Sequence, residues 1–259
     1  MADFLDFIVQ EVQKIIDKGY YDIPYNGRKV HKSLKNAIKL CKRAPIIAEI
    51  KPASPLKGMI TEKLNVKELA LAMERGGAVG ISVLTQPTHF SGSLQNITMV
   101  REVVNLPLLM KDFIISPIQI EAAEKIGANA ILLIKSIFDR ELSSKSLHEM
   151  IEIAKSKDFE VLLEVHSETE FLSSLQTKAD MIGINNRDLS SLSVSFEITK
   201  RILSKIGDGG RIIISESGIV TPDDVRLLYN LGSSAFLVGT AIMTNNDVEV
   251  KVRELVEAI

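Results

Sequence analysis

The sequence has little cysteine, no long apolar run and no marked excess of one charge. Its single cysteine, Cys41, excludes a disulfide within the chain and is typical of a protein of the reducing cytoplasm. No apolar run approaches the roughly 18 residues that a transmembrane helix needs, and the acidic, amphipathic start of the chain does not resemble a cleavable signal. We therefore expect a cytoplasmic protein with no membrane partner, in which Cys41 is an ordinary helix residue rather than a nucleophile.

The charges are nearly balanced, with 31 basic and 33 acidic residues, which gives no overall attraction to nucleic acid or to an anionic membrane. One local basic stretch comprises Arg28, Lys29, Lys32, Lys35, Lys39, Lys42 and Arg43. A solvated helix face is the favoured interpretation, and a positive collar that attracts an anionic substrate is the alternative. Nucleic-acid binding ranks lower still, because no recognition motif accompanies the stretch.

Eight short apolar runs alternate with longer amphipathic stretches. The runs cover residues 46–51, 79–84, 107–111, 129–134, 160–165, 180–185, 211–216 and 235–239. Each is too short for a helix, and several are rich in Ile and Val, as buried strands are. Near-continuous apolar strands between helices predict a parallel sheet covered on both faces. Eight such units favour an α/β fold of the (β/α)8 TIM-barrel class over an open doubly wound sheet, and no GxGxxG follows the first run.

The chain has no linker rich in Gly, Ser or Pro, so we expect a single domain over residues 1–259. Residues 1–45 precede the first strand and are predicted to form a helical N-terminal extension, with helices at about residues 3–18 and 32–42. Three glycines are the expected ends of later helices: Gly77, Gly127 and Gly232. A helix start is expected at Thr221, because proline and two aspartates follow it.

Ionisable residues recur where the odd-numbered strands end. They are Glu49 and Lys51 on the first strand, Lys111 on the third, Glu164 on the fifth and Glu216 on the seventh. Residues two apart on a strand share a face, so Glu49 and Lys51 should point the same way. The active site of a TIM barrel lies at the carboxyl ends of its strands, and odd-numbered strands fill the same interior layers. The pattern therefore predicts a pocket of Lys and Glu, together with Asn185 and Ser217 from neighbouring strand ends.

Two Gly-containing turns are candidate phosphate sites. Gly218 follows the seventh strand, and Gly239 and Thr240 follow the eighth, which is where TIM barrels often bind phosphate. An ordinary turn is the alternative for each. His89, after the second strand, is a candidate general base, and the other histidines lack metal-binding spacing, so we expect no metal. No GxSxG motif is present, which leaves Lys and Glu to transfer protons on a phosphorylated small molecule.

Seven motifs occur in a particular order along the chain: IIAEIKPASPLKG, VLTQPTHFSGS, PLLMKDFI, LLEVHSE, IGINNRDL, ISESGI and FLVGTAIM. Together they resemble indole-3-glycerol phosphate synthase, the ring-closing enzyme family of tryptophan biosynthesis. The resemblance spans residues 46–243, and the helical extension is similar to that of the family too. It implies conversion of 1-(2-carboxyphenylamino)-1-deoxyribulose 5-phosphate to indole-3-glycerol phosphate, with loss of CO₂ and water and without a cofactor or metal.

The resemblance also implies roles for individual residues. Lys111 is the expected general acid that protonates the ketone oxygen during ring closure, and Glu164 the expected base of the dehydration. Lys51 is a substrate contact or the acid of the later step, and Glu49 orders these lysines. Burial and a neighbouring lysine should lower the pKa of Lys111, while Glu49 should raise it again.

The remaining expected contacts divide into three groups. In the first group, Asn185 and Ser217 orient the substrate, Glu216 supports them, and Ser54 contacts the substrate. Those that line an apolar slot for the anthranilate ring are Phe90, Phe113, Leu132 and Leu189, with core packing an equal alternative for Leu132. Those near the phosphate are Lys51, Arg187 and the amides of Gly218, Gly239 and Thr240. The chain departs from the family pattern at Pro52, Leu56 and His89, and the last departure puts an aromatic substrate contact at His89 in doubt.

Two rival functions remain open from the sequence. A phosphoribosyl-anthranilate isomerase would need a Cys–Asp acid–base pair at the mouth, whereas Cys41 precedes the first strand. A catalytically idle barrel that binds a phosphorylated ligand or serves as a partner subunit is disfavoured because Lys51, Lys111 and Glu164 are all retained. We expect a small phosphorylated substrate as the partner of the chain, no nucleic acid, and a monomer or weak homo-oligomer.

Overall fold

A computed structural model describes residues 3–24, 30–54, 58–59, 65–188 and 193–259. Within these ranges the elements, in chain order, are α1 Phe4–Asp17, α2 Leu34–Leu40, β1 Ile46–Ile50, β2 Ala53–Ser54, β3 Gly58–Met59, α3 Val66–Arg75, β4 Gly80–Leu84, α4 Pro87–Phe90, α5 Leu94–Val103, β5 Leu108–Lys111, α6 Pro117–Lys125, β6 Ala130–Ile134, α7 Lys135–Asp139, α8 Leu147–Ser156, β7 Glu160–Val165, α9 Glu168–Ser174, β8 Met181–Asn185, α10 Glu197–Lys205, β9 Ile212–Glu216, α11 Pro222–Asn230, β10 Ala235–Val238, α12 Thr240–Met243 and α13 Val248–Val256.

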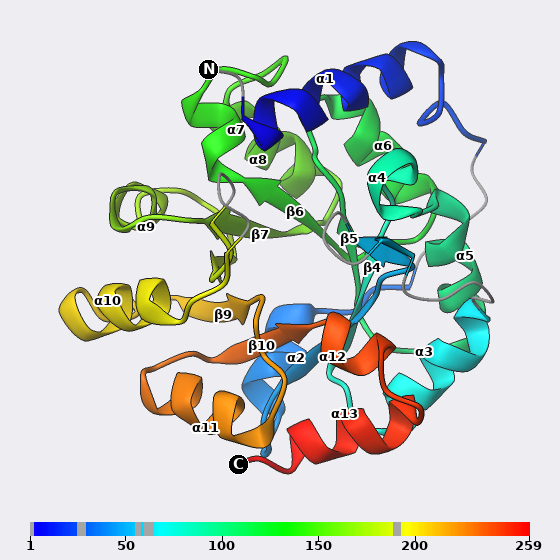
Figure 1. The fold of residues 1–259 in the computed structure, drawn as a ribbon. Helices are drawn as coiled ribbons and strands as arrows, with labels where there is room; N and C mark the ends of the chain where they lie inside the picture. The colour runs from blue at the N-terminus through cyan, green and yellow to red at the C-terminus, as the bar shows by residue number, and fades with distance from the viewer. Residues whose placement is uncertain (1–2, 25–29, 55–57, 60–64, 189–192) are drawn as a thin grey trace.

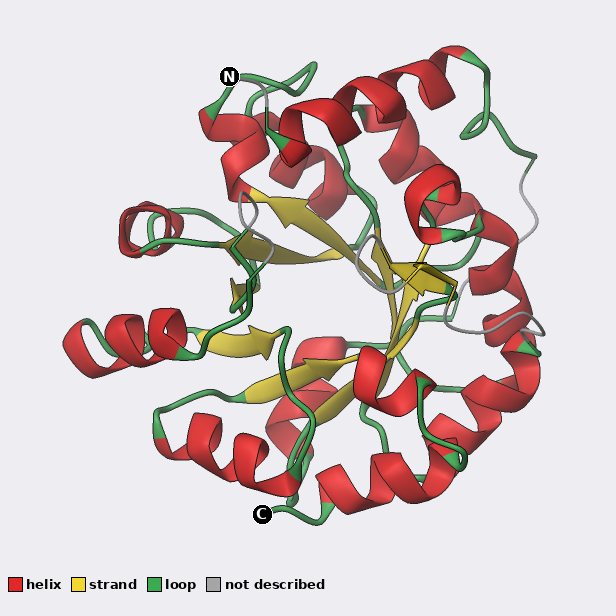
Figure 2. Cartoon of the chain, viewed as in Figure 1, coloured by secondary structure: helices red, strands yellow, loops and turns green. Residues whose placement is uncertain are grey.

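Eight parallel strands close into a barrel in the order β1-β10-β9-β8-β7-β6-β5-β4 (Figure 1). These strands coincide with the eight apolar runs, so the predicted (β/α)8 TIM barrel is confirmed. Helices surround the ring of strands, as Figure 2 shows. Within the described chain, no helix is both long enough and apolar enough to cross a membrane.

The alternation predicted for the first strand is present in β1. Ile47 packs with side chains of the barrel interior, such as Leu109 and Leu162. Ile46 and Ala48 instead belong to the larger core between the barrel and its helices. Glu49 shares the interior side with Ile47 because strand side chains alternate between faces. The strand therefore carries its carboxylate into the barrel rather than toward the helices.

Helix ends follow the punctuation of the sequence. The three expected end glycines all have positive φ angles, of 95° at Gly77, 83° at Gly127 and 109° at Gly232. Glycine adopts this conformation without steric cost, which explains the residue type at these helix ends. Thr221 forms a capping box with Asp224 at the start of α11, which confirms the predicted helix start.

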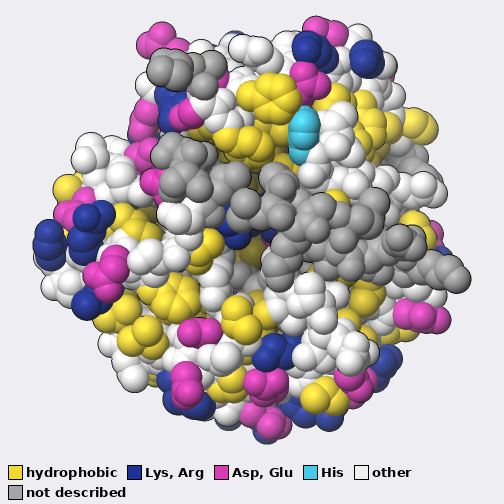
Figure 3. All heavy atoms as spheres, in the orientation of Figure 1, with side chains coloured by type: hydrophobic (Ala, Val, Ile, Leu, Met, Phe, Trp, Pro, Cys, Tyr) yellow, Lys and Arg dark blue, Asp and Glu magenta, His cyan; other side chains and the backbone are white. Residues whose placement is uncertain are grey.

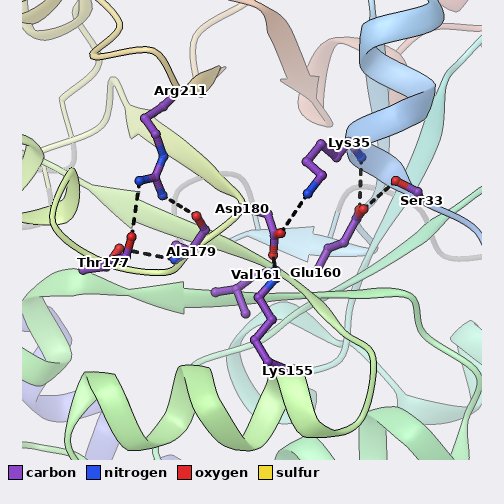
Figure 4. Close-up of polar contacts among 9 residues, drawn as sticks. All are labelled: Ser33, Lys35, Lys155, Glu160, Val161, Thr177, Ala179, Asp180 and Arg211. Carbon is purple, nitrogen blue, oxygen red and sulfur yellow. Dashed lines mark hydrogen bonds and ion pairs between the residues drawn. The ribbon is translucent and has the colours of Figure 1, made fainter.

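Helix α2 closes the amino-terminal end of the barrel. Ser33 Oγ donates to Glu160 Oε1 at 2.5 Å, and Lys35 Nζ lies 3.1 Å from Asp180 Oδ1 (Figure 4). Glu160 begins β7 and Asp180 immediately precedes β8, so these contacts lie at the end opposite the carboxyl ends of the strands. A substrate-attracting collar on α2 would therefore be at the wrong end of the barrel, which makes that alternative wrong for the described basic residues. Arg28 and Lys29 lie outside the described residues.

The segment after α1 fastens the extension to the carboxyl end of the barrel. Tyr20 Oη donates to the Thr85 carbonyl at 3.0 Å, and Tyr21 Oη donates to Asp112 Oδ2 at 2.9 Å. Thr85 follows β4 and Asp112 follows β5. A second link joins Arg140, after α7, to Asp3 at 2.8 Å. The extension thus contacts both ends of the barrel, α2 at one and the α1 segment at the other.

Candidate active site

Lys111 lies at the centre of a cluster of buried charges at the carboxyl ends of the strands. Its Nζ is 3.3 Å from Glu49 Oε1 on β1 and 3.0 Å from Glu216 Oε2 on β9. Lys51 Nζ approaches the other oxygen of Glu49, at 3.5 Å. The two carboxylates are almost completely buried, and burial of unpaired charge costs several kcal/mol or more. The structure therefore brings together Glu49, Lys51, Lys111 and Glu216, which strand alternation and the odd-numbered strand ends of a barrel predicted to be neighbours.

The cluster shifts the ionisation of its members. Burial would raise the pKa of Glu49, but the Lys111 and Lys51 ammoniums outweigh it and hold that pKa below its usual range. Burial would lower the pKa of Lys111, yet Glu216, Glu49 and Glu164 together raise it well above its usual range. The two expected opposing effects, burial that lowers the Lys111 pKa and Glu49 that raises it, are both present, and the further carboxylates Glu216 and Glu164 make the net change a rise.

Glu216 is the carboxylate of the cluster whose pKa lies near neutral pH. Burial, together with the negative charges of Glu164 and Glu49, raises the pKa of Glu216 to about 7, although Lys111 opposes the rise. Glu216 and Lys111 share a hydrogen bond of 3.0 Å. A group that titrates near neutrality beside a charged lysine can hold or release a proton at low cost.

Two glycines make room for the buried carboxylates. A Cβ at Gly239 would lie 2.3 Å from Glu49 Oε2, and a Cβ at Gly183 would lie 2.2 Å from Glu216 Oε1. Both distances are far inside van der Waals contact. Gly239 was expected to offer an amide to phosphate, and the structure gives it this additional role. Gly183 was not singled out from the sequence, since a glycine inside an apolar run signals only a close approach of some neighbour.

Glu164, at the end of β7, is held by two neighbours. Asn185 Nδ2 donates to Glu164 Oε1 at 3.1 Å, and His166 Nε2 lies 3.1 Å from the same oxygen. Burial would raise the pKa of Glu164, but His166, Lys111 and Asn185 lower it to about 2. The predicted base is therefore ionised at neutral pH, and Asn185 is in contact with it as a neighbour on β8.

His166 is a site residue that sequence reasoning missed. It was set aside because no metal-binding spacing includes it, but it lies two residues after Glu164 and therefore on the same side. The same alternation that predicted the proximity of Glu49 and Lys51 could have found it. Asp112 was also missed. It directly follows Lys111 in the sequence, is buried, and accepts hydrogen bonds from Tyr21 Oη and Thr85 Oγ1.

A cavity of about 290 Å³ opens beside the cluster. Its lining includes Glu49, Lys51, Lys111, Arg187, Ser217, Gly218, Gly239 and Thr240. Ser217 and Gly218 both have positive φ, of 67° and 86°, and Thr240 begins α12 directly after Gly239. Backbone N–H groups in such turns and at helix starts suit an anion. All the residues expected near the phosphate thus border one cavity.

The expected apolar slot is described in part. Phe90 and Phe113 stack with ring centroids 5.8 Å apart. Leu132 is 1% exposed and packs in the barrel interior next to Leu162 on β7, which favours its core-packing interpretation. Leu189, like Leu56, lies outside the described residues. Figure 3 shows a group of hydrophobic side chains in the upper part of the view, next to an exposed histidine.

The loop after β1 turns back as a short hairpin that the sequence did not predict. Ala53 of β2 pairs with Met59 of β3, and Ser54 pairs with Gly58 through the backbone. The side chain of Ser54 lies outside the described part of the chain, so its substrate contact stays a prediction. Pro52, which precedes the hairpin, is buried.

Two other candidates are placed away from the charge cluster. His89 packs edge-on against Phe7 of α1, with centroids 5.2 Å apart, which favours a contact with the extension over a role as general base. Cys41 follows α2 at the amino-terminal end of the barrel, so it supplies no Cys–Asp pair at the mouth. Among the described residues, no group of three or more His, Cys, Asp or Glu side chains is arranged to hold a metal ion.

Solved structures share the architecture at low sequence identity. A thiamine phosphate pyrophosphorylase from Pyrococcus furiosus superimposes with a TM-score of 0.62 at 17% identity, over 87% of this chain and 97% of that chain. An N-acetylmannosamine-6-phosphate 2-epimerase from Clostridium perfringens gives 0.60 at 15% identity, over 83% and 93%. Likeness at this level of identity supports the barrel fold alone.

Sequence comparison is more specific. A family model described as indole-3-glycerol phosphate synthase matches residues 6–255. The indole-3-glycerol phosphate synthase of Methanocaldococcus jannaschii is 39% identical over 252 residues, which cover 96% of this chain and 91% of that protein. That of Shouchella clausii is 43% identical over 218 residues, covering 83% and 84%. The chain belongs to the indole-3-glycerol phosphate synthase family.

Proposed function

We propose that the chain makes indole-3-glycerol phosphate, with the buried Lys and Glu cluster as its acid–base machinery. The substrate is 1-(2-carboxyphenylamino)-1-deoxyribulose 5-phosphate, and CO₂ and water leave. The observation that carries the assignment of roles is the position of Lys111, held between Glu49 and Glu216 beside a cavity with an anion-suited rim. Family membership supports the reaction, and this geometry supports the residues.

Lys111 acts as general acid in ring closure. The aromatic carbon that bears the carboxylate attacks the ketone carbon while Lys111 gives a proton to the ketone oxygen. Loss of CO₂ from the same ring carbon then restores aromaticity. The raised pKa of Lys111 ensures that it carries its proton when substrate binds. Glu216, with a pKa raised to about 7, is the neighbour best suited to return a proton afterwards.

Dehydration needs an acid for the departing hydroxyl and a base for the proton that is lost. Glu164 is the base, because its pKa of about 2 leaves it ionised. Lys51 is the acid, because it lines the cavity. Glu49 contacts both Lys51 and Lys111 and so keeps the two lysines close together. Asn185 and Ser217 orient the substrate. Asn185 also donates a hydrogen bond to the base, Glu164.

The phosphate occupies the rim formed by the turns after β9 and β10. The amides of Gly218, Gly239 and Thr240 bind its oxygens, and this role is supported by Lys51 and Arg187, which line the same cavity. The anthranilate ring extends toward Phe90 and Phe113, whose tilted pair offers apolar surface. We further propose that barrel and extension work as one domain in the cytoplasm, where a single unpaired Cys41 is stable.

Indole fluorescence tests this function directly. Purified protein should convert the carboxyphenylamino substrate to a fluorescent indole product, with EDTA present throughout and no metal added. A reaction without enzyme and one with boiled enzyme are the controls. Fluorescence no greater than in those controls would refute the proposed function. Product formed only after metal is restored would refute acid–base catalysis by Lys and Glu alone.

A further inference from the structure

We propose that His166 is a positioning residue that keeps Glu164 ionised and correctly oriented, through a chain of contacts that runs from Glu164 across His166 to Glu170. This inference rests on the proposed function, in which Glu164 is the base of the dehydration. His166 itself touches the carboxylate of Glu164 and acts on the substrate only through it.

The geometry of the chain is compact. His166 Nε2 lies 3.1 Å from Glu164 Oε1, and His166 Nδ1 lies 3.8 Å from Glu170 Oε2. The imidazole side chain is only 11% exposed, and Glu164 is 4% exposed. The ring is therefore enclosed between two carboxylates rather than pointing into solvent.

This placement selects the charged form of the ring. A neutral imidazole has one N–H and one lone pair, so one of its nitrogens would direct a lone pair at a carboxylate. Only the imidazolium presents N–H groups on both sides. Neither contact is aligned as a hydrogen bond within the described chain, so the attraction is mainly between charges.

Glu170 is anchored independently of His166's ring. Its Oε2 accepts from the His166 backbone N–H at 2.7 Å, and its Oε1 accepts from Ser136 Oγ at 2.6 Å. It lies in the first turn of α9, where a negative charge is favourable. Glu170 can thus hold the imidazolium in one place, and the imidazolium in turn holds Glu164.

The charges around Glu164 explain why a positive charge on His166 would help to keep Glu164 ionised. Glu164 also faces Lys111 and accepts a hydrogen bond from Asn185. The substrate brings a carboxylate and a phosphate into the site, and nearby negative charge favours protonation of Glu164. The His166 charge opposes that effect. In agreement, the two carboxylates outweigh burial and raise the pKa of His166 to about 9.

His166→Asn tests the positive charge, because asparagine can still donate a hydrogen bond but carries no charge. We expect the acidic limb of its kcat–pH profile to move up by about one pH unit, with about a tenfold loss of kcat at the foot of that limb. KM should change much less than kcat. His148→Asn, at an exposed position on α8, is the matched control and should leave the profile unchanged.

Carboxyl ¹³C NMR separates this inference from the proposed function. The Glu164 signal, assigned with Glu164→Gln, should titrate at a pH at least one unit higher in His166→Asn than in the wild type. An unchanged Glu164 titration would overturn the inference whether or not the protein turns over substrate. A wild type without turnover would instead refute the proposed function alone. If His166→Asn does not fold, Glu170→Gln serves in its place, and an unchanged titration of His166 in that variant would overturn the inference equally.

Discussion

The buried negative charge of Glu49 in β1 is balanced by two lysines. Lys111 and Lys51 lie on either side of the Glu49 carboxylate, at 3.3 and 3.5 Å, and Lys111 reaches Glu216 as well. Breaking a buried ion pair by removal of one partner costs about 3–5 kcal/mol, since the other charge is left alone. Each member of the cluster therefore depends on the others for both its protonation and its place.

Gly239→Ala tests the space reserved for Glu49. The new Cβ would lie 2.3 Å from Glu49 Oε2, so the carboxylate must move away from Lys51 or Lys111. We expect stability to fall by about 1–3 kcal/mol and kcat to fall at least about tenfold. Urea unfolding and the indole assay measure the two effects.

A double variant provides the control for this substitution. In a Glu49→Ala background the added methyl meets no carboxylate, so Gly239→Ala should then cost much less stability than it does alone. Equal costs in the two backgrounds would show that the added methyl is not opposed by the Glu49 carboxylate.

The sequence predicted which charged side chains lie together, but it did not predict their pKa values or the glycines that make room for them. Strand alternation placed Glu49 and Lys51 on one face, because side chains alternate with a period of two. The barrel pattern, in which odd-numbered strands fill the same interior layers, added Lys111. It did not predict the net rise of the Lys111 pKa, which depends on how many carboxylates surround the amine in three dimensions. Gly183 was missed for the same reason, since the atom that it accommodates belongs to another strand.

The extension is the element that differs most from a plain barrel. Its two helices were predicted from their periodicity, and α1 and α2 confirm them within a few residues. Where they dock was not predictable, because docking depends on long-range partners such as Asp112 and Asp180. The hairpin β2–β3 was also missed, as two residues per strand leave no periodic pattern to detect.

Tyr21→Phe tests the fastening of the extension to β5. The variant leaves the ring in place but removes the hydroxyl that donates to Asp112, a buried carboxylate. We expect the free energy of unfolding to fall by about 1–3 kcal/mol, and kcat to fall because Asp112 directly follows Lys111. Urea unfolding and the indole assay report these changes.

Tyr229→Phe is the matched control for that variant, because Tyr229 is 48% exposed on α11. Its stability and activity should equal those of the wild type. If Tyr21→Phe were as stable and active as this control, the hydroxyl contact would have no part in holding the extension.

In the whole molecule, the two ends of the barrel have different tasks. The carboxyl end holds the charge cluster and the cavity, while the amino end carries a second network in which Asp180 joins Lys35 and Lys155 (Figure 4). Hydrogen bonds and ion pairs to Lys155, Val161 and Lys35 overcome burial and lower the pKa of Asp180. We expect this second network to stabilise the fold without acting in catalysis.

Asp180→Asn should therefore reduce stability and leave kcat nearly unchanged. Loss of the ion pairs with Lys35 and Lys155, which are both partly exposed, should cost about 1–2 kcal/mol at pH 7. Because the folded-state pKa of Asp180 is lowered, its contribution is present above the ordinary pKa and is lost as the pH falls through the folded-state value. The difference from the wild type should thus shrink below about pH 4. Urea unfolding across pH measures it, with exposed Asp223→Asn as control.

A stability difference that persisted unchanged at low pH would contradict the assignment of Asp180's effect to its charge. A large loss of kcat in Asp180→Asn, with the protein still folded, would show that the two ends of the barrel are coupled.

The most direct test of the whole proposal is the kcat of Lys111→Ala in the indole fluorescence assay. With Glu49 and Glu216 left to face each other, the variant lacks its proton donor, and we expect kcat to fall about 10²–10⁴-fold while circular dichroism shows a folded barrel. Lys39→Ala, on the exposed face of α2, should retain wild-type turnover. Near-normal turnover in folded Lys111→Ala would contradict the central claim that Lys111 is the general acid of ring closure.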